Sequence, residues 1–486
     1  MVASPAMSPP GIPSILPLLV LLAAAPAQAE VGCTESEERG GARPTLSGPT
    51  QTLDSEDGSF RIHWTDEGSD APTGRADTDG NGQPDFLDRI LTGLTVGQES
   101  YREQGWREVA PDDGAEGTDA VDVYVLGIDA NGYAFQTPAA EGGDAGSSCA
   151  IHLSSSLGDS LDGILESVAA HELHHCVQYA YTTGAPSWML EATATHQQYR
   201  VFSSPALQAA LQILWIGRLS QPQRPLHDLG GRYEYAGFVF LHFWESFGEL
   251  DRGRPPLLWE ALREADGDWI AALDAESERL FGRSFARTFS DYSTWNTFAC
   301  GRDDGSHYDP VLFPCTLPDT SVPISLVDGD LQLELPQVPY TAAYAEILPE
   351  GDERPVELTC GGVGEDGARA QVRLLSLDRF LRAAEVVDAS ARGDEPFVVR
   401  LDDPLDVAGS VLVVVTSSGL DPVRIDCTVQ RVEPVLPEPP SPPPPDAAGC
   451  GCAGTGEPAA SALLLLGLGV LPKRRRRRFP DAVARV

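Results

Sequence analysis

The chain has 486 residues, with 72 acidic and 34 basic side chains and a formal net charge of −38. Hydrophobic residues make up 42% of it, which excludes a chain too polar to fold, and its composition excludes a collagen-like fibre. A protein this acidic repels the phosphates of nucleic acids, so we expect no nucleic-acid partner.

The first 29 residues have the pattern of a secretory signal peptide. Residues 15–25 are almost purely apolar, and Ala27-Gln28-Ala29 fits the small-x-small rule for cleavage, although no Lys or Arg precedes the apolar run. The run is too short to span a bilayer. We therefore expect export, an N-terminal segment at residues 30–54, and an oxidising compartment in which most of the nine cysteines pair.

Alternating apolar residues predict a strand at residues 60–64, and an acidic loop follows it. The loop Asp77-Thr78-Asp79-Gly80-Asn81-Gly82-Gln83-Pro84-Asp85-Phe86-Leu87-Asp88 matches an EF-hand calcium loop, with Gly82 at the sharp-turn position and Asp instead of Glu at the last. A helix is expected from Phe86 but none before Asp77, so this is a lone, weak, structural calcium loop. A metal-free turn is the alternative. Its expected ligands are Asp77, Asp79, Asn81, Gln83, Asp85 and Asp88.

A second alternating run predicts a strand at residues 121–127, and the next segment carries the chemistry. Residues 171–175 read His-Glu-Leu-His-His, the H-E-x-x-H pattern, on a segment with a helical apolar stripe. A spacing of four places His171 and His175 on one helix face, where both imidazoles can bind one zinc ion, and leaves Glu172 as the general base. A surface helix that carries histidines by chance is the alternative.

A catalytic zinc site needs a third protein ligand. After the break at residues 184–186, a second helix begins near Ser187, and Glu191 on its first turns can fold back over the first helix. We therefore predict Glu191 as the third ligand. His196 is the rival, although it points away from Glu191 by roughly 140° at about 100° per residue. His174, off the face shared by His171 and His175, is a weaker one.

The remaining elements predict an α+β chain in two parts. Helical spacing recurs in residues 160–300, for example at Leu207, Leu211 and Leu214, and again from Phe285 after Ser284. Past a connector at residues 301–320, short apolar runs at 356–360, 397–401, 411–416 and 423–429 predict a β-sandwich over residues 321–432.

Six cysteines are expected to form disulfides. Cys360 and Cys427 lie at strand ends of the β-rich part, and Cys300 with Cys315 closes a short loop. Cys149 can reach Cys176 beside the metal helix, unless Cys176 is a buried free thiol. Cys33 is left unassigned.

The C-terminal end has the pattern of an extended linker followed by a sorting signal. A proline-rich linker at residues 433–448 precedes a cysteine-containing box, an apolar run at 459–471 and a basic cluster at 473–478. This order resembles the MYXO-CTERM sorting tail of myxobacterial surface proteins over residues 449–478, with an extra tail at 479–486. The resemblance implies a sorting machinery and attachment through Cys450 or Cys452 at the cell surface. A simple membrane anchor is the alternative, and we expect membrane contact through this apolar run only.

Taken together, residues 55–300 resemble a family of secreted bacterial gluzincin metalloproteases, known largely from myxobacteria. The helix with Trp188 and Glu191 is similar to the W-x-x-E-G-x-A pattern of the third-ligand helix, with Ala192 in place of Gly. The resemblance implies a zincin-like domain, of a small sheet plus active-site helices, that hydrolyses proteins or peptides. It also implies that Tyr235, or else Tyr233, is the donor to the oxyanion. A calcium-dependent adhesion or carbohydrate-binding surface protein with a vestigial site is the rival function.

Overall fold

A computed structural model describes residues 43–433 with several gaps, and the described residues belong to the first of two compact units, Met1–Val435 and Leu436–Val486. The predicted signal peptide, Cys33, the proline-rich linker and the sorting tail with Cys450 and Cys452 lie outside the described residues. The residues that are not described are 1–42, 113, 138–145, 162, 248–254, 304, 309–312, 314, 320–322, 326–328, 335–338, 349–353, 362–368, 378–382, 393–395, 402–409, 419–423 and 434–486.

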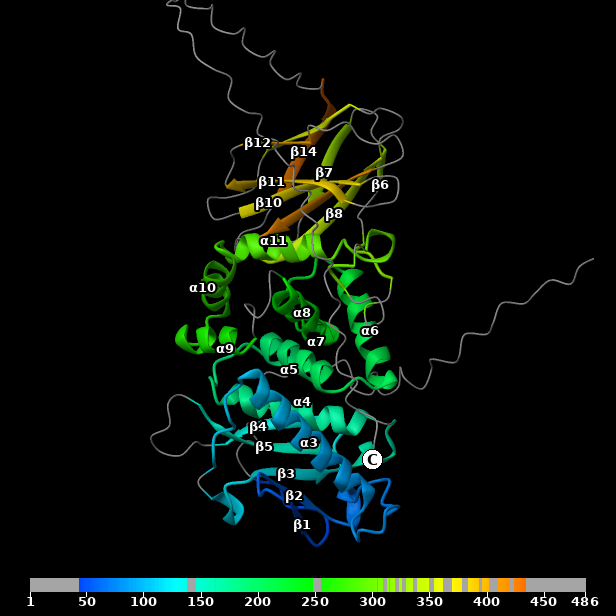
Figure 1. The fold of residues 1–486 in the computed structure, drawn as a ribbon, viewed down its shortest axis with the longest axis vertical. Coiled ribbons are helices and arrows are strands. Elements are labelled where there is room, and N and C mark those ends of the chain that lie inside the picture. Colours follow the sequence, from blue (N-terminus) through cyan, green and yellow to red (C-terminus); the bar gives the residue numbers. More distant parts are fainter. Residues whose placement is uncertain are drawn as a thin grey trace, which may run out of the picture. The chain divides into compact units, whose positions relative to one another are not determined.

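The N-terminal part contains a five-stranded mixed sheet in the order β1-β2-β3-β5-β4 (Figure 1, blue to cyan). The three central strands are parallel, and the two edge strands pair with their neighbours antiparallel. Ile62, Val123 and Ile151 lie side by side in register, and all three are fully buried. The strands are β1 (Gln51–Asp54), β2 (Phe60–Trp64), β3 (Val121–Leu126), β4 (Gly132–Thr137) and β5 (Ser148–Ser154).

Two helices, α3 (Asp85–Gln104) and α4 (Ile164–Tyr179), pack on the buried face of this sheet and on each other. Glycine lets their backbones approach closely. A Cβ at Gly93 would lie 2.4 Å from the carbonyl oxygen of Glu166, and one at Gly97 would lie 3.2 Å from the Cβ of Ala170. The Tyr101 hydroxyl donates a hydrogen bond to the Ala170 carbonyl oxygen at 2.8 Å. Helix α3 therefore supports α4 along its length.

Further along the described part of the chain, seven more helices follow (Figure 1, green). Leu207 and Leu211 of α6 are buried as the helical spacing predicts, together with Trp215, whereas Leu214 is half-buried. Ser284 precedes α11, but its side chain makes no capping hydrogen bond. The helices are α5 (Ser187–Val201), α6 (Pro205–Leu219), α7 (Tyr233–Ala236), α8 (Phe238–Ser246), α9 (Pro255–Glu264), α10 (Trp269–Phe281) and α11 (Phe285–Trp295). Single 3₁₀ turns are η1 (Gly68–Asp70), η2 (Ala115–Gly117), η3 (Ser155–Asp159), η4 (Gly230–Arg232) and η5 (Cys300–Arg302).

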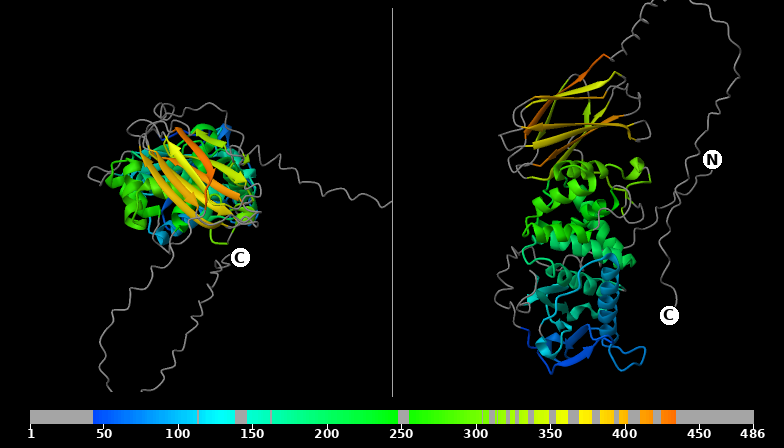
Figure 2. Two further views of the ribbon diagram at one scale, coloured as in Figure 1. Left: turned by 90° about the horizontal axis from the view of Figure 1, so that it is seen from above. Right: turned by 60° about the vertical axis from the view of Figure 1, so that its left-hand side comes forward.

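The C-terminal part contains two sheets, ordered β11-β10-β13-β8-β6 and β12-β9-β14-β7 (Figure 2, yellow to orange). Val413 and Val415 of the first sheet share one buried cluster with Leu358 and Val429 of the second, so the sheets pack face to face. The strands are β6 (Pro323–Ser325), β7 (Gly329–Glu334), β8 (Thr341–Leu348), β9 (Val356–Gly361), β10 (Arg369–Leu377), β11 (Ala383–Arg392), β12 (Phe397–Leu401), β13 (Ser410–Ser417) and β14 (Arg424–Arg431).

Helix α11 contacts the other face of the first of these sheets. The Tyr344 hydroxyl on β8 donates to the carbonyl oxygen of Ser293 at 2.8 Å, and Arg373 on β10 pairs with Asp291 at 2.5 Å. All four residues are buried.

The prediction of an α+β chain is confirmed. The strand predicted at residues 60–64 is β2. The strand predicted at 121–127 is β3, which ends one residue earlier, at Leu126. The helix predicted after the acidic loop is α3, which begins at Asp85 rather than Phe86. The four β-rich runs correspond to β9, β12, β13 and β14 within one residue at their N-terminal ends and two at their C-terminal ends. Within the described ranges, no helix is long and apolar enough to cross a membrane.

Candidate metal centre

Helix α4 presents His171 and His175 one turn apart on the same face. Their ring centroids are 4.8 Å apart, and both residues are less than a tenth exposed. Almost every residue from Leu165 to Tyr179 is buried, because the sheet and α3 cover one side of α4 and α5 covers another. The two imidazoles are therefore held on a rigid, enclosed helix rather than on a mobile surface.

Helix α5 brings Glu191 to the two histidines. Pro186 ends the connection from α4, and the helix begins at Ser187, as the sequence predicts. The Glu191 Oε2 atom lies 3.2 Å from His171 Nε2 and 3.7 Å from His175 Nε2. Among the described residues, this trio is one of two groups of His, Cys, Asp and Glu side chains close enough to hold a metal ion.

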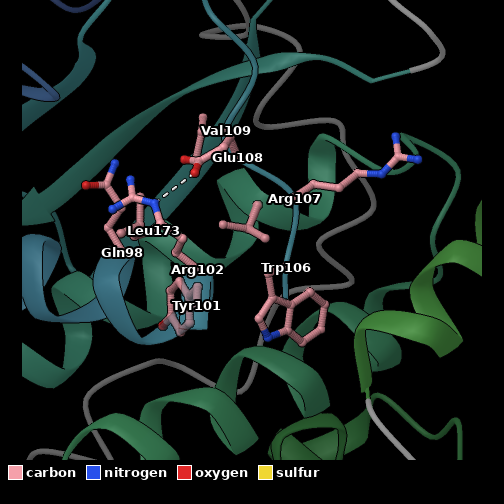
Figure 3. Close-up of a pocket in the computed structure, with 9 residues that line it drawn as sticks. Gln98, Tyr101, Arg102, Trp106, Arg107, Glu108, Val109 and Leu173 are labelled. Carbon is pink, nitrogen blue, oxygen red and sulfur yellow. Dashed lines mark hydrogen bonds and ion pairs between the residues drawn. The ribbon is translucent and has the colours of Figure 1, made fainter. Parts of the chain in front are cut away.

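Neither rival ligand joins this group. His196 is fully buried, and its Nε2 lies 3.4 Å from Glu245 Oε2, behind the face that carries Glu191. His174 is also fully buried, with its ring edge-on to Tyr101 and Trp106 at centroid distances of 4.8 and 4.5 Å. Tyr101 and Trp106 line a small cavity on that side of α4, next to an ion pair between Arg102 and Glu108 (Figure 3). His174 thus belongs to the packing between α3 and α4.

Gln178 orients His175, a role that the sequence did not reveal. The Gln178 amide nitrogen donates to the Leu190 carbonyl oxygen at 2.9 Å, which directs its Oε1 to His175 Nδ1 at 2.8 Å. The Nδ1 atom is then the protonated one, and Nε2 keeps its lone pair for a ligand. The only signal in the sequence is the spacing of three residues from His175.

Within the trio, the opposite charges of His175 and Glu191 shift each other's pKa. Burial alone would lower the pKa of His175, but the charge of Glu191 and its hydrogen bond outweigh this and raise the pKa to about 9. Burial alone would raise the pKa of Glu191, but His175 and His171 together hold it far below its usual value. The carboxylate is therefore ionised and ready to neutralise a cation.

Glu172 lies beside the trio and under strand β4. Burial raises its pKa above the usual value. A Cβ at Gly132, the first residue of β4, would lie 2.8 Å from both Cγ and Oε1 of Glu172. Only glycine leaves room for the carboxylate here, a close approach that the sequence gives no sign of.

Helix α7 closes another side of the trio. The centroids of the Tyr235 and His171 rings are 6.1 Å apart. The charge of Glu191 together with burial raises the pKa of Tyr235 well above its usual value. Tyr233 instead donates its hydroxyl to the Gln221 carbonyl oxygen at 2.8 Å. Glu234, between them, has a buried Oε2 without a hydrogen-bond partner, and burial with the nearby charge of Glu191 raises its pKa to about 7. Glu234 was not expected from the sequence.

The acidic loop forms the second candidate group, in which three of its four predicted carboxylate ligands converge. Carboxylate oxygens of Asp77, Asp79 and Asp85 lie within 4.8 Å of one another. Asp88 lies outside this group and accepts a hydrogen bond from Asn81 at 3.1 Å. The backbone nitrogen of Gln83 donates to the Asn81 side chain at 2.7 Å, and Gly82 has a φ of +87°, which suits glycine at the sharp turn.

The three expected disulfides are present. Cys149 pairs with Cys176, Cys300 with Cys315, and Cys360 with Cys427, at Cα–Cα distances of 5.4, 4.5 and 4.0 Å. Cys176 is therefore not a free thiol. Because Cys176 follows His175 directly, its disulfide ties α4 to strand β5.

No known protein-family model matches this sequence, and no curated protein is significantly similar to it.

Proposed function

We propose that the chain is an exported, zinc-dependent endopeptidase. The observation that carries the proposal is the convergence of His171 Nε2, His175 Nε2 and Glu191 Oε2 with buried Glu172 beside them. Two imidazole nitrogens and one carboxylate oxygen are a donor set of catalytic zinc sites, which leave a fourth position open. The Nε2 atom of His175 faces Glu191, and Gln178 orients the ring, which fits such a ligand role.

A zinc ion in this site would polarise the scissile carbonyl group and lower the pKa of water. Glu172 takes a proton from the attacking water and returns it to the leaving amine, a role helped by burial, which raises its pKa towards neutrality. Tyr235 donates a hydrogen bond to the developing oxyanion. Its raised pKa keeps the hydroxyl protonated at neutral pH.

The rest of the chain is assigned around this site. Residues 55–300 form a zincin-like catalytic domain, and residues 321–432 form a β-sandwich accessory domain. The substrates are proteins or peptides. The signal peptide directs the enzyme out of the cell, and the sorting tail directs it to the cell surface. The three disulfides are compatible with export.

Calcium is assigned to the loop of Asp77, Asp79 and Asp85 as structural support. Three carboxylates within 4.8 Å repel one another without a cation, and oxygen ligands suit Ca²⁺. The loop leads directly into α3, whose glycines pack against α4. The ion therefore stabilises the catalytic domain from outside the zinc site.

Glu172→Gln tests the proposed reaction. The variant should bind zinc like the wild type but lose peptide hydrolysis, because an amide cannot accept the proton. The measurements are zinc content by elemental analysis and cleavage of an unfolded protein. Glu99→Gln, an exposed carboxylate on α3, is the matched control and should keep full activity. Near-wild-type cleavage by Glu172→Gln, or wild-type protein that binds zinc but cleaves nothing, would favour the rival surface-binding function.

A further inference from the structure

Arg218 near the end of α6 is a buried cation that no carboxylate of the described residues pairs with. It is 4% exposed, and its guanidinium lies over the Tyr233 ring, 4.6 Å from the centroid. Its hydrogen bond goes to the Pro225 carbonyl oxygen, at 3.4 Å. Within the described ranges, no Asp or Glu forms an ion pair with it, whereas buried Arg302 and Arg373 pair with Glu346 at 3.5 Å and Asp291 at 2.5 Å.

A small cavity adjoins this guanidinium. It is lined by Arg218, by Tyr292 and Asn296 of α11, and by Tyr344 of β8, with apolar side chains between them. Tyr292 is 1% exposed, its hydroxyl oxygen lies against the Arg218 guanidinium, and among the described residues nothing accepts its hydroxyl hydrogen. The size of the cavity suits one water-sized particle.

The polar groups left free at the cavity are donors. The Tyr344 hydroxyl already donates to the Ser293 carbonyl oxygen. Asn296 accepts from the Tyr308 hydroxyl at 2.5 Å and donates to the Tyr344 hydroxyl, so its amide is already bonded. The guanidinium of Arg218 and the hydroxyl hydrogen of Tyr292 therefore form a site that offers hydrogen-bond donors and one positive charge.

Such a site selects an anion over water. A water molecule can satisfy the Tyr292 hydroxyl, but it brings no charge, and a buried guanidinium without a counter-charge is costly. A carboxylate or phosphate group is too large for a cavity of one-water size. We propose that this cavity binds a chloride ion that contacts both Arg218 and Tyr292. The site is independent of the proposed peptidase function.

Thermal unfolding of the full mature chain tests the site. The melting temperature is measured in sodium chloride and in sodium methanesulfonate at equal ionic strength, pH and metal content. Chloride should raise it in a saturable way, because a ligand that binds only the folded state stabilises it by mass action. Tyr292→Phe removes the hydroxyl beside Arg218 and should abolish or strongly reduce the rise in melting temperature that chloride causes. Tyr133→Phe, an exposed tyrosine on β4, should keep the full shift.

Bromide locates the ion directly. Crystals grown in sodium bromide should show an anomalous-scattering peak beside the Arg218 guanidinium, and Arg218→Met should lack it. Tyr292→Phe carries the test if Arg218→Met does not fold. The proposal is wrong if chloride and methanesulfonate give equal melting temperatures, if Tyr292→Phe keeps the whole shift, or if no bromide peak lies at Arg218.

Discussion

At the scale of single residues, the candidate zinc site depends on side chains that fix the ligands as much as on the ligands. Gln178 links His175 to the backbone of α5 through the Leu190 carbonyl oxygen. The same hydrogen bonds that set the imidazole tautomer therefore also hold the two ligand helices together. Residues of this kind typically contribute about 10- to 100-fold to metal affinity.

Replacing Glu191 and His196 separately tests the third ligand. Glu191→Ala should weaken zinc binding by at least about 100-fold, more than loss of an orienting partner costs. His196→Ala removes a buried ring that faces Glu245 and should lower stability while leaving zinc affinity close to that of the wild type. Competition against a chromogenic chelator measures both affinities. Loss of zinc in His196→Ala alone would transfer the ligand role to that residue.

Gly132→Ala tests the close approach between β4 and the proposed base. The added Cβ would lie 2.8 Å from Glu172 Cγ, so the carboxylate must move away from its place beside the metal trio. A displacement of about 1 Å can cost about 100-fold in turnover, and we expect a loss of that order with zinc content unchanged. Gly361→Ala on β9, where an added Cβ meets nothing within 4 Å, is the matched control. Equal steady-state turnover in both variants would contradict this role for Gly132.

At the scale of elements, the packing of α3 on α4 connects the acidic loop to the metal helix. Gly93, Gly97 and Tyr101 line the contact, so the position of α3 is set along more than two turns. Arg89 on α3 also pairs with Glu166 on α4 at 2.8 Å. Any change that loosens the N-terminus of α3 therefore reaches the helix that carries His171 and His175.

Calcium should accordingly raise the melting temperature, with weak affinity of roughly 10⁻⁴ to 10⁻³ M, because Asp has a shorter side chain than Glu at the last loop position. Chelation of calcium should lower the melting temperature before zinc is lost. Asp77→Ala with Asp79→Ala should abolish the calcium dependence. The control is Glu99→Ala with Glu103→Ala, which removes two exposed charges from α3. Calorimetry at a series of calcium concentrations compares the loop variant with the control. If the melting temperature of the loop variant still rises with calcium, the ion binds elsewhere.

At the scale of the whole molecule, local patterns were predictable and close approaches were not. The spacing of His171 and His175, and the helix break before Glu191, are properties of neighbouring residues, so they can be read directly. Strand β5 was missed because all seven of its residues are buried and show no alternation. Gly132, Gln178 and Glu234 were missed because their roles come from elements that meet only in the folded chain. The contact between Asp88 and Asn81 within the acidic loop is likewise a property of the folded loop that the ligand pattern does not reveal.

The disulfide between Cys149 and Cys176 should matter more to the zinc site than the disulfide in the C-terminal sheets. Its removal by a double Ala substitution should cost about 3.5 kcal/mol of stability, since the bond joins cysteines 27 residues apart. It should also speed zinc release, because Cys176 adjoins His175. Cys360→Ala with Cys427→Ala is the control, which should lower stability without changing zinc release. Equal zinc release rates in both double variants, measured with a chelating dye, would contradict the coupling.

The position of this cystine also gives the assembly of the site an order in time. The bond that ties α4 to β5 forms only where thiols are oxidised. For a chain made in a reducing cytosol and then exported, the metal helix would gain its final support after crossing the membrane. The proposed peptidase activity would thereby be restricted to chains that have already left the cell.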